Sequence, residues 1–318
     1  MRARSLTTLA LGALALAGTA VPAEATFPGR NGRIVFTLTS FGRSFFSERL
    51  QAVAPATGRR IPLRGCGGRG RRGTSCHDRE PIFAPGGRRF YFVAGSGGPD
   101  PEPENSRLVV ARPDGSIVRS VRDPFFGTGG LSPNGRRMAF GARRGMQTLS
   151  VATGWLRPLN RVRGYILDVD WSSRNRLLYE RRYRRDELID GRGIDLYAVN
   201  PGGKRLRRLT TDGRSTSAEW SPDGRRIVYE RGRPGVGSAS TIWTMDVDGS
   251  NKHRIARGFS PTWSPDGRKI AYARGIDIDD RTVLYIARPD GTHRRRLLSI
   301  RDGIGTIAWQ PLPGNAGG

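Results

Sequence analysis

A ten-residue pattern of apolar and polar positions occurs twice, almost unchanged, in the second half of the chain. It reads Trp-Ser-Pro-Asp-Gly-Arg-Arg-Ile-Val-Tyr over 220–229 and Trp-Ser-Pro-Asp-Gly-Arg-Lys-Ile-Ala-Tyr over 263–272. Pro presets φ for a turn, Asp can accept a hydrogen bond from the backbone ahead of it, and Gly tolerates a positive φ. The pattern therefore predicts a strand that ends on Trp, a tight turn and a second strand.

Weaker copies of this hairpin extend over the chain. The aromatic or leucine residues that anchor them stand at 83, 131, 171, 220, 263 and 309, with spacings of 48, 40, 49, 43 and 46 residues. A period in the forties with four strands in each unit is typical of β-propeller blades. The first strand, after Asn31-Gly32, has no anchor before it, and Trp309 has no hairpin after it. We predict an all-β, six-bladed propeller of four-stranded blades, closed where the C-terminal strand joins the N-terminal blade.

Composition agrees with a fold of short strands and tight turns. The chain has 44 Gly, 21 Pro and a formal net charge of +26. Of its 54 basic residues 51 are arginine, and these are scattered through every segment. We interpret this excess as GC-rich codon usage and a solvated surface, and we expect no specific nucleic-acid partner. Binding of an anionic cell-wall polymer is the alternative.

The N-terminus has the features of a secretory signal peptide. Arg2 and Arg4 precede the apolar stretch 6–21, and Ala23-Glu24-Ala25 provides a cleavage site. The apolar stretch is too short to favour a membrane span, and no later one is long enough. We expect a signal peptide at 1–25, the propeller at 26–313 and a flexible tail at 314–318. The mature chain would be secreted or held in the periplasm or cell envelope.

The two cysteines, Cys66 and Cys76, flank a Gly- and Arg-rich stretch. In an exported protein such a pair predicts a disulfide. A metal site would need more ligands than the adjacent His77 and Asp78 supply at this spacing.

The Trp-Ser-Pro-Asp-Gly units resemble the repeat of TolB-type propellers, which are relatives of WD-type repeats. The match is strongest at 220–229 and 263–272, and it covers essentially the whole predicted mature chain. The resemblance implies a six-bladed, often exported propeller that serves as a protein-binding scaffold. TolB belongs to a cell-envelope complex with a peptidoglycan-associated lipoprotein. It also carries an α/β domain ahead of its propeller, which we expect this chain to lack.

The repeat also resembles the propellers of prolyl oligopeptidase-type serine hydrolases. That role is not expected, because no G-x-S-x-G elbow is set between a strand and a helix and no hydrolase domain follows Pro313.

Long, irregular connections should gather on one face of the propeller, opposite the tight Asp-Gly turns. Variable loops on a rigid scaffold are where binding usually occurs. We predict that this long-loop face binds a partner through acidic residues, namely Asp186, Glu187, Asp190, Asp277, Asp279 and Asp280.

A second candidate site is the mouth of the central channel. Polar residues stand three positions before every anchor: Glu80, Thr128, Asp168, Ser217, Ser260 and Thr306. Asp170 and Glu219 directly precede two anchors. A ring of Glu80, Asp168, Asp170 and Glu219 could hold a hard cation such as calcium, or receive a cationic side chain. The alternative is that these side chains bind neighbouring backbone or local arginines.

No catalytic residues are predicted. The three histidines are His77, His253 and His293, and we interpret the last two as surface residues. His77, Asp78 and Glu80 form the one cluster of catalytic type, which we interpret as part of a loop. Packing and turn chemistry account for the repeat residues Trp171, Trp220, Asp223, Gly224, Trp263, Asp266, Gly267 and Trp309.

The predicted function is therefore that of a non-enzymatic, monomeric propeller. It would bind a protein or peptide in the cell envelope or outside the cell through its long-loop face, without a cofactor. The alternative is a calcium-dependent hydrolase or lyase with its site at the channel mouth.

Overall fold

The computed structural model describes residues 27–41, 46–64, 75–97, 107–122, 129–142, 144–159, 161–183, 193–232, 240–276 and 281–314. Strands dominate these ranges. Their single helical element is a 3-10 turn, η1 (Pro85–Gly87), so no described helix is long enough to cross a membrane. The predicted signal peptide, Cys66 and the side chain of Cys76 lie outside the described part of the chain, and so does their predicted disulfide.

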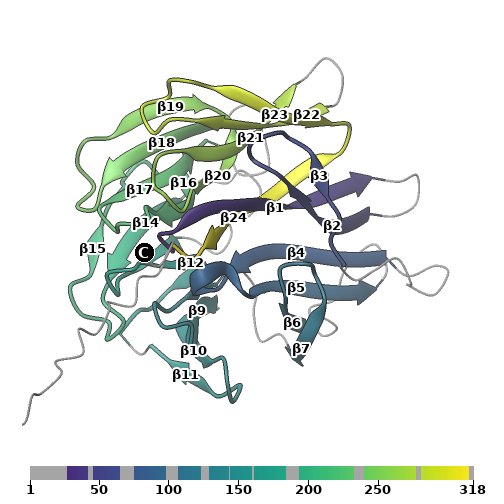
Figure 1. Cartoon of the computed structure of the whole chain (residues 1–318). Coiled ribbons are helices and arrows are strands. Elements are labelled where there is room, and N and C mark those ends of the chain that lie inside the picture. Colours follow the sequence, from purple (N-terminus) through teal and green to yellow (C-terminus); the bar gives the residue numbers. More distant parts are fainter. Residues whose placement is uncertain are drawn as a thin grey trace, which may run out of the picture.

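Six four-stranded antiparallel units follow one another around the molecule (Figure 1). From the inner to the outer strand they are blade 1, β24 (Gly303–Leu312), β1 (Arg30–Phe41), β2 (Phe46–Val53) and β3 (Arg60–Ile61); blade 2, β4 (Ser75–Phe83), β5 (Phe90–Gly97), β6 (Arg107–Ala111) and β7 (Ile117–Arg122); blade 3, β8 (Gly130–Leu131), β9 (Arg137–Ala142), β10 (Gly145–Ser150) and β11 (Leu156–Pro158); blade 4, β12 (Tyr165–Trp171), β13 (Leu177–Arg182), β14 (Ile194–Val199) and β15 (Arg207–Arg208); blade 5, β16 (Ser215–Trp220), β17 (Arg226–Arg231), β18 (Thr241–Asp246) and β19 (His253–Arg257); and blade 6, β20 (Phe259–Trp263), β21 (Ile270–Ile276), β22 (Arg281–Ala287) and β23 (Arg295–Ile300).

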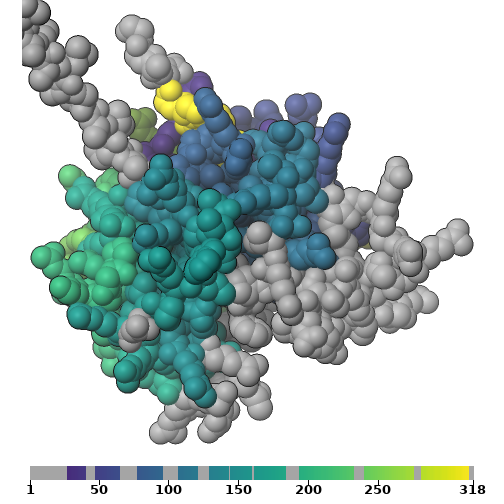
Figure 2. Space-filling view, turned by 90° about the horizontal axis from the view of Figure 1, so that it is seen from below, coloured from purple at the N-terminus to yellow at the C-terminus, as the bar shows by residue number. Residues whose placement is uncertain are grey.

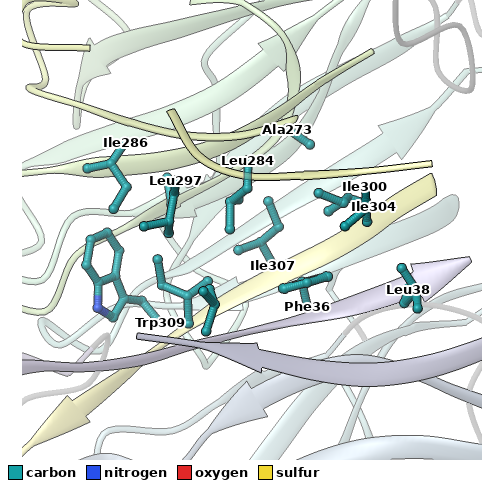
Figure 3. Close-up of a cluster of buried hydrophobic side chains, with 13 residues drawn as sticks. Phe36, Leu38, Ala273, Leu284, Ile286, Leu297, Ile300, Ile304, Ile307 and Trp309 are labelled. Atoms are coloured by element: carbon teal, nitrogen blue, oxygen red, sulfur yellow. The ribbon is translucent and has the colours of Figure 1, made fainter. Parts of the chain in front are cut away.

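The predicted ring closure is confirmed. The last strand, β24, pairs antiparallel with β1, with Trp309 opposite Ile34 and Ile307 opposite Phe36. β24 therefore supplies the inner strand of the blade that β1 begins. Its apolar side chains pack against blade 6 on the other side, where Leu284 and Leu297 are buried in the same cluster (Figure 3).

The Trp-Ser-Pro-Asp-Gly unit forms the turn between the first two strands of its blade. In blade 5 the Ser221 hydroxyl donates to Asp223 Oδ1 at 2.6 Å, and the Arg225 N–H donates to the same oxygen at 3.1 Å. Gly224 takes a φ of 62°, which an L side chain rarely adopts. Trp220 is fully buried between blades 4 and 5. The unit is thus a turn and a packing element, on the face that carries the tight turns.

Arginine has a structural role between blades that the sequence interpretation did not include. Arg33 in blade 1 donates to the Pro113 carbonyl of blade 2 at 3.0 Å, and Arg174 in blade 4 donates to the Asp223 carbonyl of blade 5 at 2.7 Å. The guanidinium of Arg176 lies 5.1 Å from the centre of the Trp220 ring. A planar guanidinium can bind a carbonyl or cover an indole in ways that a lysine cannot match.

Candidate functional site: the central channel

A β-bulge interrupts the inner strands three residues before their anchors. The strand register shifts between Arg79 and Ile82 in β4, and at the corresponding positions of β12, β16 and β20. Glu80, Ser217 and Ser260 have φ values of 57°, 49° and 50° at this point. A bulge releases a backbone N–H from the ladder. In blades 2, 4, 5 and 6 the recurrent polar position is therefore a bulge position beside the channel.

Two buried glutamates bind the released N–H groups. The Ser217 N–H donates to Glu180 Oε1 at 2.5 Å, and the Ser260 N–H donates to Glu230 Oε2 at 3.2 Å. Each glutamate belongs to the second strand of one blade and bonds to the inner strand of the next. Burial raises the pKa of both carboxyls, and the charges of Asp168 and Glu230 raise the pKa of Glu180 further.

Sequence reasoning missed Glu180 and Glu230. The signal that could have found them is a Tyr-Glu pair in the second strand of two successive blades, Tyr179-Glu180 and Tyr229-Glu230. A carboxylate directly after a buried aromatic residue, in the middle of a strand, indicates a specific polar contact.

Asp170 and Glu219 form a second pair of contacts between blades, nearer the tight turns. Asp170 accepts from the Trp171 N–H and, through its other oxygen, from the Trp220 N–H, both at 2.8 Å. Glu219 accepts from the Thr262 hydroxyl and the Trp263 N–H. Their carboxylates therefore link the inner strands of blades 4, 5 and 6. Burial raises the pKa of Asp170 from 3.8 to about 6, and burial together with the charge of Asp170 raises that of Glu219 well above its usual value.

Two cavities follow one another along the channel. They share Asp168, Ser217 and Ser260 as lining residues. The turn-side cavity, of about 180 Å³, is lined by the residues that follow these three and by the Trp263 and Trp309 anchors. The loop-side cavity, of about 400 Å³, is lined by the residues that precede them and by others of neighbouring strands.

The loop-side cavity is acidic. Asp168, Glu180 and Glu230 line it, and Arg182 is the one basic residue among its lining residues. Carboxyl groups that share a buried space raise one another's pKa, and a positive charge that enters the space stabilises their ionised forms. Within the described ranges, no three His, Cys, Asp or Glu side chains are grouped closely enough to hold a metal ion.

Tyrosine and arginine also meet on blade 4, at residues that line neither cavity. Tyr183 directly follows β13, is 43% exposed, and lies under the Arg208 guanidinium, whose carbon is 4.9 Å from the ring centre. The Tyr183 and Tyr197 hydroxyls are 2.5 Å apart. The buried carboxylate of Asp195 accepts from Arg208 Nη2 at 2.7 Å and so fixes the guanidinium over the ring.

The structure gathers three of the four acids predicted at the channel mouth. Asp168, Asp170 and Glu219 line the turn-side cavity, and Asp168 lines the loop-side cavity as well. Glu80 lines neither cavity, and its carboxylate is 3.9 Å from Arg79 Nε. The acids predicted to bind a partner lie outside the described residues: Asp186, Glu187, Asp190, Asp277, Asp279 and Asp280.

The histidines differ partly from the expectation. His253 and His293 are exposed. His77 and Asp78 are buried in β4 and do not belong to a loop, because the strand begins at Ser75. The His77 ring Nδ1 lies 3.8 Å from Glu48 Oε2, where β2 and β4 make a parallel pairing that joins blades 1 and 2.

The raised pKa of Asp170 predicts a pH-dependent stability. The pKa of the Asp170 carboxyl is about 6 in the folded chain and 3.8 when it is unperturbed, as in the unfolded chain, so the folded chain binds the carboxyl proton more tightly. The contribution to stability is therefore complete below pH 3.8 and is lost as the pH rises through 6. In urea unfolding at pH 4.5 and 7.5, we expect Asp170→Asn to reduce this loss by about 2 kcal/mol relative to the unsubstituted chain. Parallel pH profiles for the two proteins would contradict the prediction.

Comparison with known proteins identifies the fold. No protein-family model matches the chain. The Tol-Pal system protein TolB 1 of Novosphingobium aromaticivorans is 38% identical over 63 residues, which are 20% of this chain and only 14% of that protein. The crystal structure of TolB from Acinetobacter baumannii aligns with a TM-score of 0.66 at 17% identity, over 88% of this chain and 67% of that one.

Two further structures align over their full length. A putative TolB from Agrobacterium tumefaciens gives a TM-score of 0.56 at 20% identity, over 89% of this chain and 100% of that one. A chain of a nidogen/laminin complex gives a TM-score of 0.59 at 8% identity, again over 89% and 100%. With its six four-stranded sheets closed by β24, this chain has a TolB-like β-propeller fold.

Proposed function

We propose that this chain is an exported, non-enzymatic propeller that binds a protein or peptide of the cell envelope at the long-loop end of its channel. The observation that carries the proposal is the acidic loop-side cavity in a chain with a net charge of +26. A predicted signal peptide and a fold similar to that of TolB support the envelope location. The similar chain from a nidogen/laminin complex comes from an assembly of two proteins.

The chemistry of the cavity indicates what the partner presents. Asp168, Glu180 and Glu230 provide negative charge, and the space of about 400 Å³ admits an extended side chain. Arginine or lysine meets both conditions, because its aliphatic stem is apolar and its charged end donates several hydrogen bonds. Tyr183 and Arg208, which meet elsewhere on blade 4, are of the residue types that contribute most to protein interfaces.

The test is a screen of peptides from envelope proteins, with each basic peptide paired with a version in which Gln replaces Arg and Lys. We expect binding to require the basic residue. For peptides that bind, the Kd should rise at least about tenfold in Glu180→Gln and in Glu230→Gln, measured by fluorescence anisotropy. Circular dichroism and thermal unfolding establish that each variant is folded.

Asp290→Asn is the matched control, because it removes one carboxylate from an exposed tight turn and should leave the Kd unchanged. Binding that ignores the basic residue, or that is equal in all variants, would contradict the proposal. Calcium binding that disappears in Asp168→Ala and Glu219→Ala would favour the calcium-dependent hydrolase or lyase instead.

A further inference from the structure

Blade 3 differs from the rest of the chain in its charge. Residues 124–167 contain seven arginines and no aspartate or glutamate, although the whole chain has 28 acidic residues among 318. Arginine is no denser here than elsewhere, but no carboxylate within the segment balances it. Blade 3 therefore presents positive charge alone.

The outer turn of blade 3 also differs in its packing. In the other five blades, a glycine of the turn between the third and fourth strands lies against the preceding blade. A Cβ on any of these glycines would lie only 2.0 to 3.0 Å from an atom of the neighbouring blade or connection. The five glycines are Gly58, Gly115, Gly203, Gly249 and Gly291. Among the described residues, a Cβ on Gly154 would meet nothing within 4 Å. This turn therefore projects away from the body of the ring.

Apolar side chains are exposed at this projection. Trp155 is 73% exposed and Leu156 is 44% exposed, while Ile117 and Val118 in β7 are 54% and 40% exposed. Arg119 of β7 donates to the Val151 and Ala152 carbonyls, which places β7 beside the turn. Of the six large apolar side chains that are exposed in the described ranges, four belong to these two neighbouring segments.

Arginines surround the apolar residues. Arg136 and Arg157 are exposed and Arg119 is half-buried, and the Arg136 carbonyl accepts from the Val151 N–H at 2.9 Å. Figure 2 views the molecule from the end at which β10 and β11 lie in Figure 1, with blade 3 towards the reader. We name this surface the blade 3 edge and define it by its apolar and basic residues: Ile117, Val118, Trp155, Leu156, Arg119, Arg136, Arg137 and Arg157.

We propose that the blade 3 edge docks on the surface of an anionic phospholipid bilayer. Tryptophan and leucine on a projecting turn can enter the headgroup region, and flanking arginines bind lipid phosphates. The single sign of charge complements an anionic surface over the whole edge. Adsorption to a polyanion alone would use the arginines but would gain nothing from an exposed Trp-Leu pair. Because no residue of this edge lines the acidic loop-side cavity, docking does not depend on the proposed partner binding.

The test is co-sedimentation of the full chain with vesicles. One set contains equal parts of phosphatidylglycerol and phosphatidylcholine, and the other contains phosphatidylcholine alone. We expect binding to the anionic vesicles that weakens with salt, and little binding to the neutral ones. The double variant Trp155→Ala/Leu156→Ala should lower the partition coefficient about tenfold. Arg136→Gln/Arg157→Gln should lower it as well and reduce its dependence on salt.

Leu206→Ala is the control, because Leu206 is a similarly exposed apolar residue, at 51%, that adjoins the outer strand of blade 4. It should bind vesicles like the unsubstituted chain. Absence of binding to anionic vesicles would overturn the proposal. So would equal binding of the Trp155→Ala/Leu156→Ala variant, which would assign the arginines to general adsorption of polyanions such as cell-wall polymers.

Discussion

A chain that ends at Asp302 should fail to fold cooperatively, because it lacks β24. Removal of this strand leaves β1 without its inner neighbour and exposes the buried faces of blades 1 and 6. Loss of one buried Trp side chain alone costs about 3 to 5 kcal/mol, and the total stability of a domain is about 5 to 15 kcal/mol. Removing Trp309 together with Ile304 and Ile307 is therefore expected to cost more than the whole free energy of unfolding of the ring.

Urea unfolding followed by far-ultraviolet circular dichroism checks this expectation. The shortened chain should show no sigmoidal transition. A chain that ends at Gly314 keeps all of β24 and should unfold at the same urea concentration as the full chain. A cooperative transition in the chain ending at Asp302 would show that blades 2 to 6 are stable as an open arc.

The second large effect is expected at the junction of blades 3 and 4. Gly141 lies in β9, and a Cβ there would stand 2.2 Å from the Ile166 carbonyl oxygen and 2.4 Å from that of Leu167, both in β12. Backbone atoms of a packed inner strand cannot move aside as a flexible side chain can. We expect Gly141→Ala to destabilise the protein by about 3 kcal/mol, which is at the upper end of overpacking costs.

A matched substitution is available in another second strand. Gly275 in β21 has an ordinary φ, and a Cβ there would meet nothing within 4 Å. Gly275→Ala should be neutral or slightly stabilising, by up to about 1 kcal/mol, because alanine restricts the unfolded chain. The two variants are compared by urea unfolding at one pH. Equal stabilities would show that blades 3 and 4 are not packed backbone to backbone at Gly141.

The fold could be predicted because its information is local and repeated. Trp220 and Trp263 end inner strands, and the Pro-Asp-Gly residues after them build turns through contacts only two residues apart in the chain. The unpaired first strand and the final Trp309 then required the ring to close through β24. Each inference used a short stretch of sequence and a constant period.

The channel could be predicted only in part, because its contacts join different blades. Asp168, Asp170 and Glu219 were recognisable from their places before the anchors. Glu180 and Glu230 were not, since each binds a bulge that lies 30 or more residues further along the chain. The exposure of Trp155 likewise depends on how blade 3 packs beside blade 2, and local sequence patterns carry no information about that packing.

Closure by β24 also has a consequence for the order in which the chain is made. β1 leaves the ribosome well before β24, so blade 1 has no inner strand until β24 has been made. Because the ring stays open until β24 is made, its final packing step is delayed and the chain stays incompletely folded for longer. If the predicted signal peptide directs export, the same delay keeps the ring open while the chain passes through a narrow export channel.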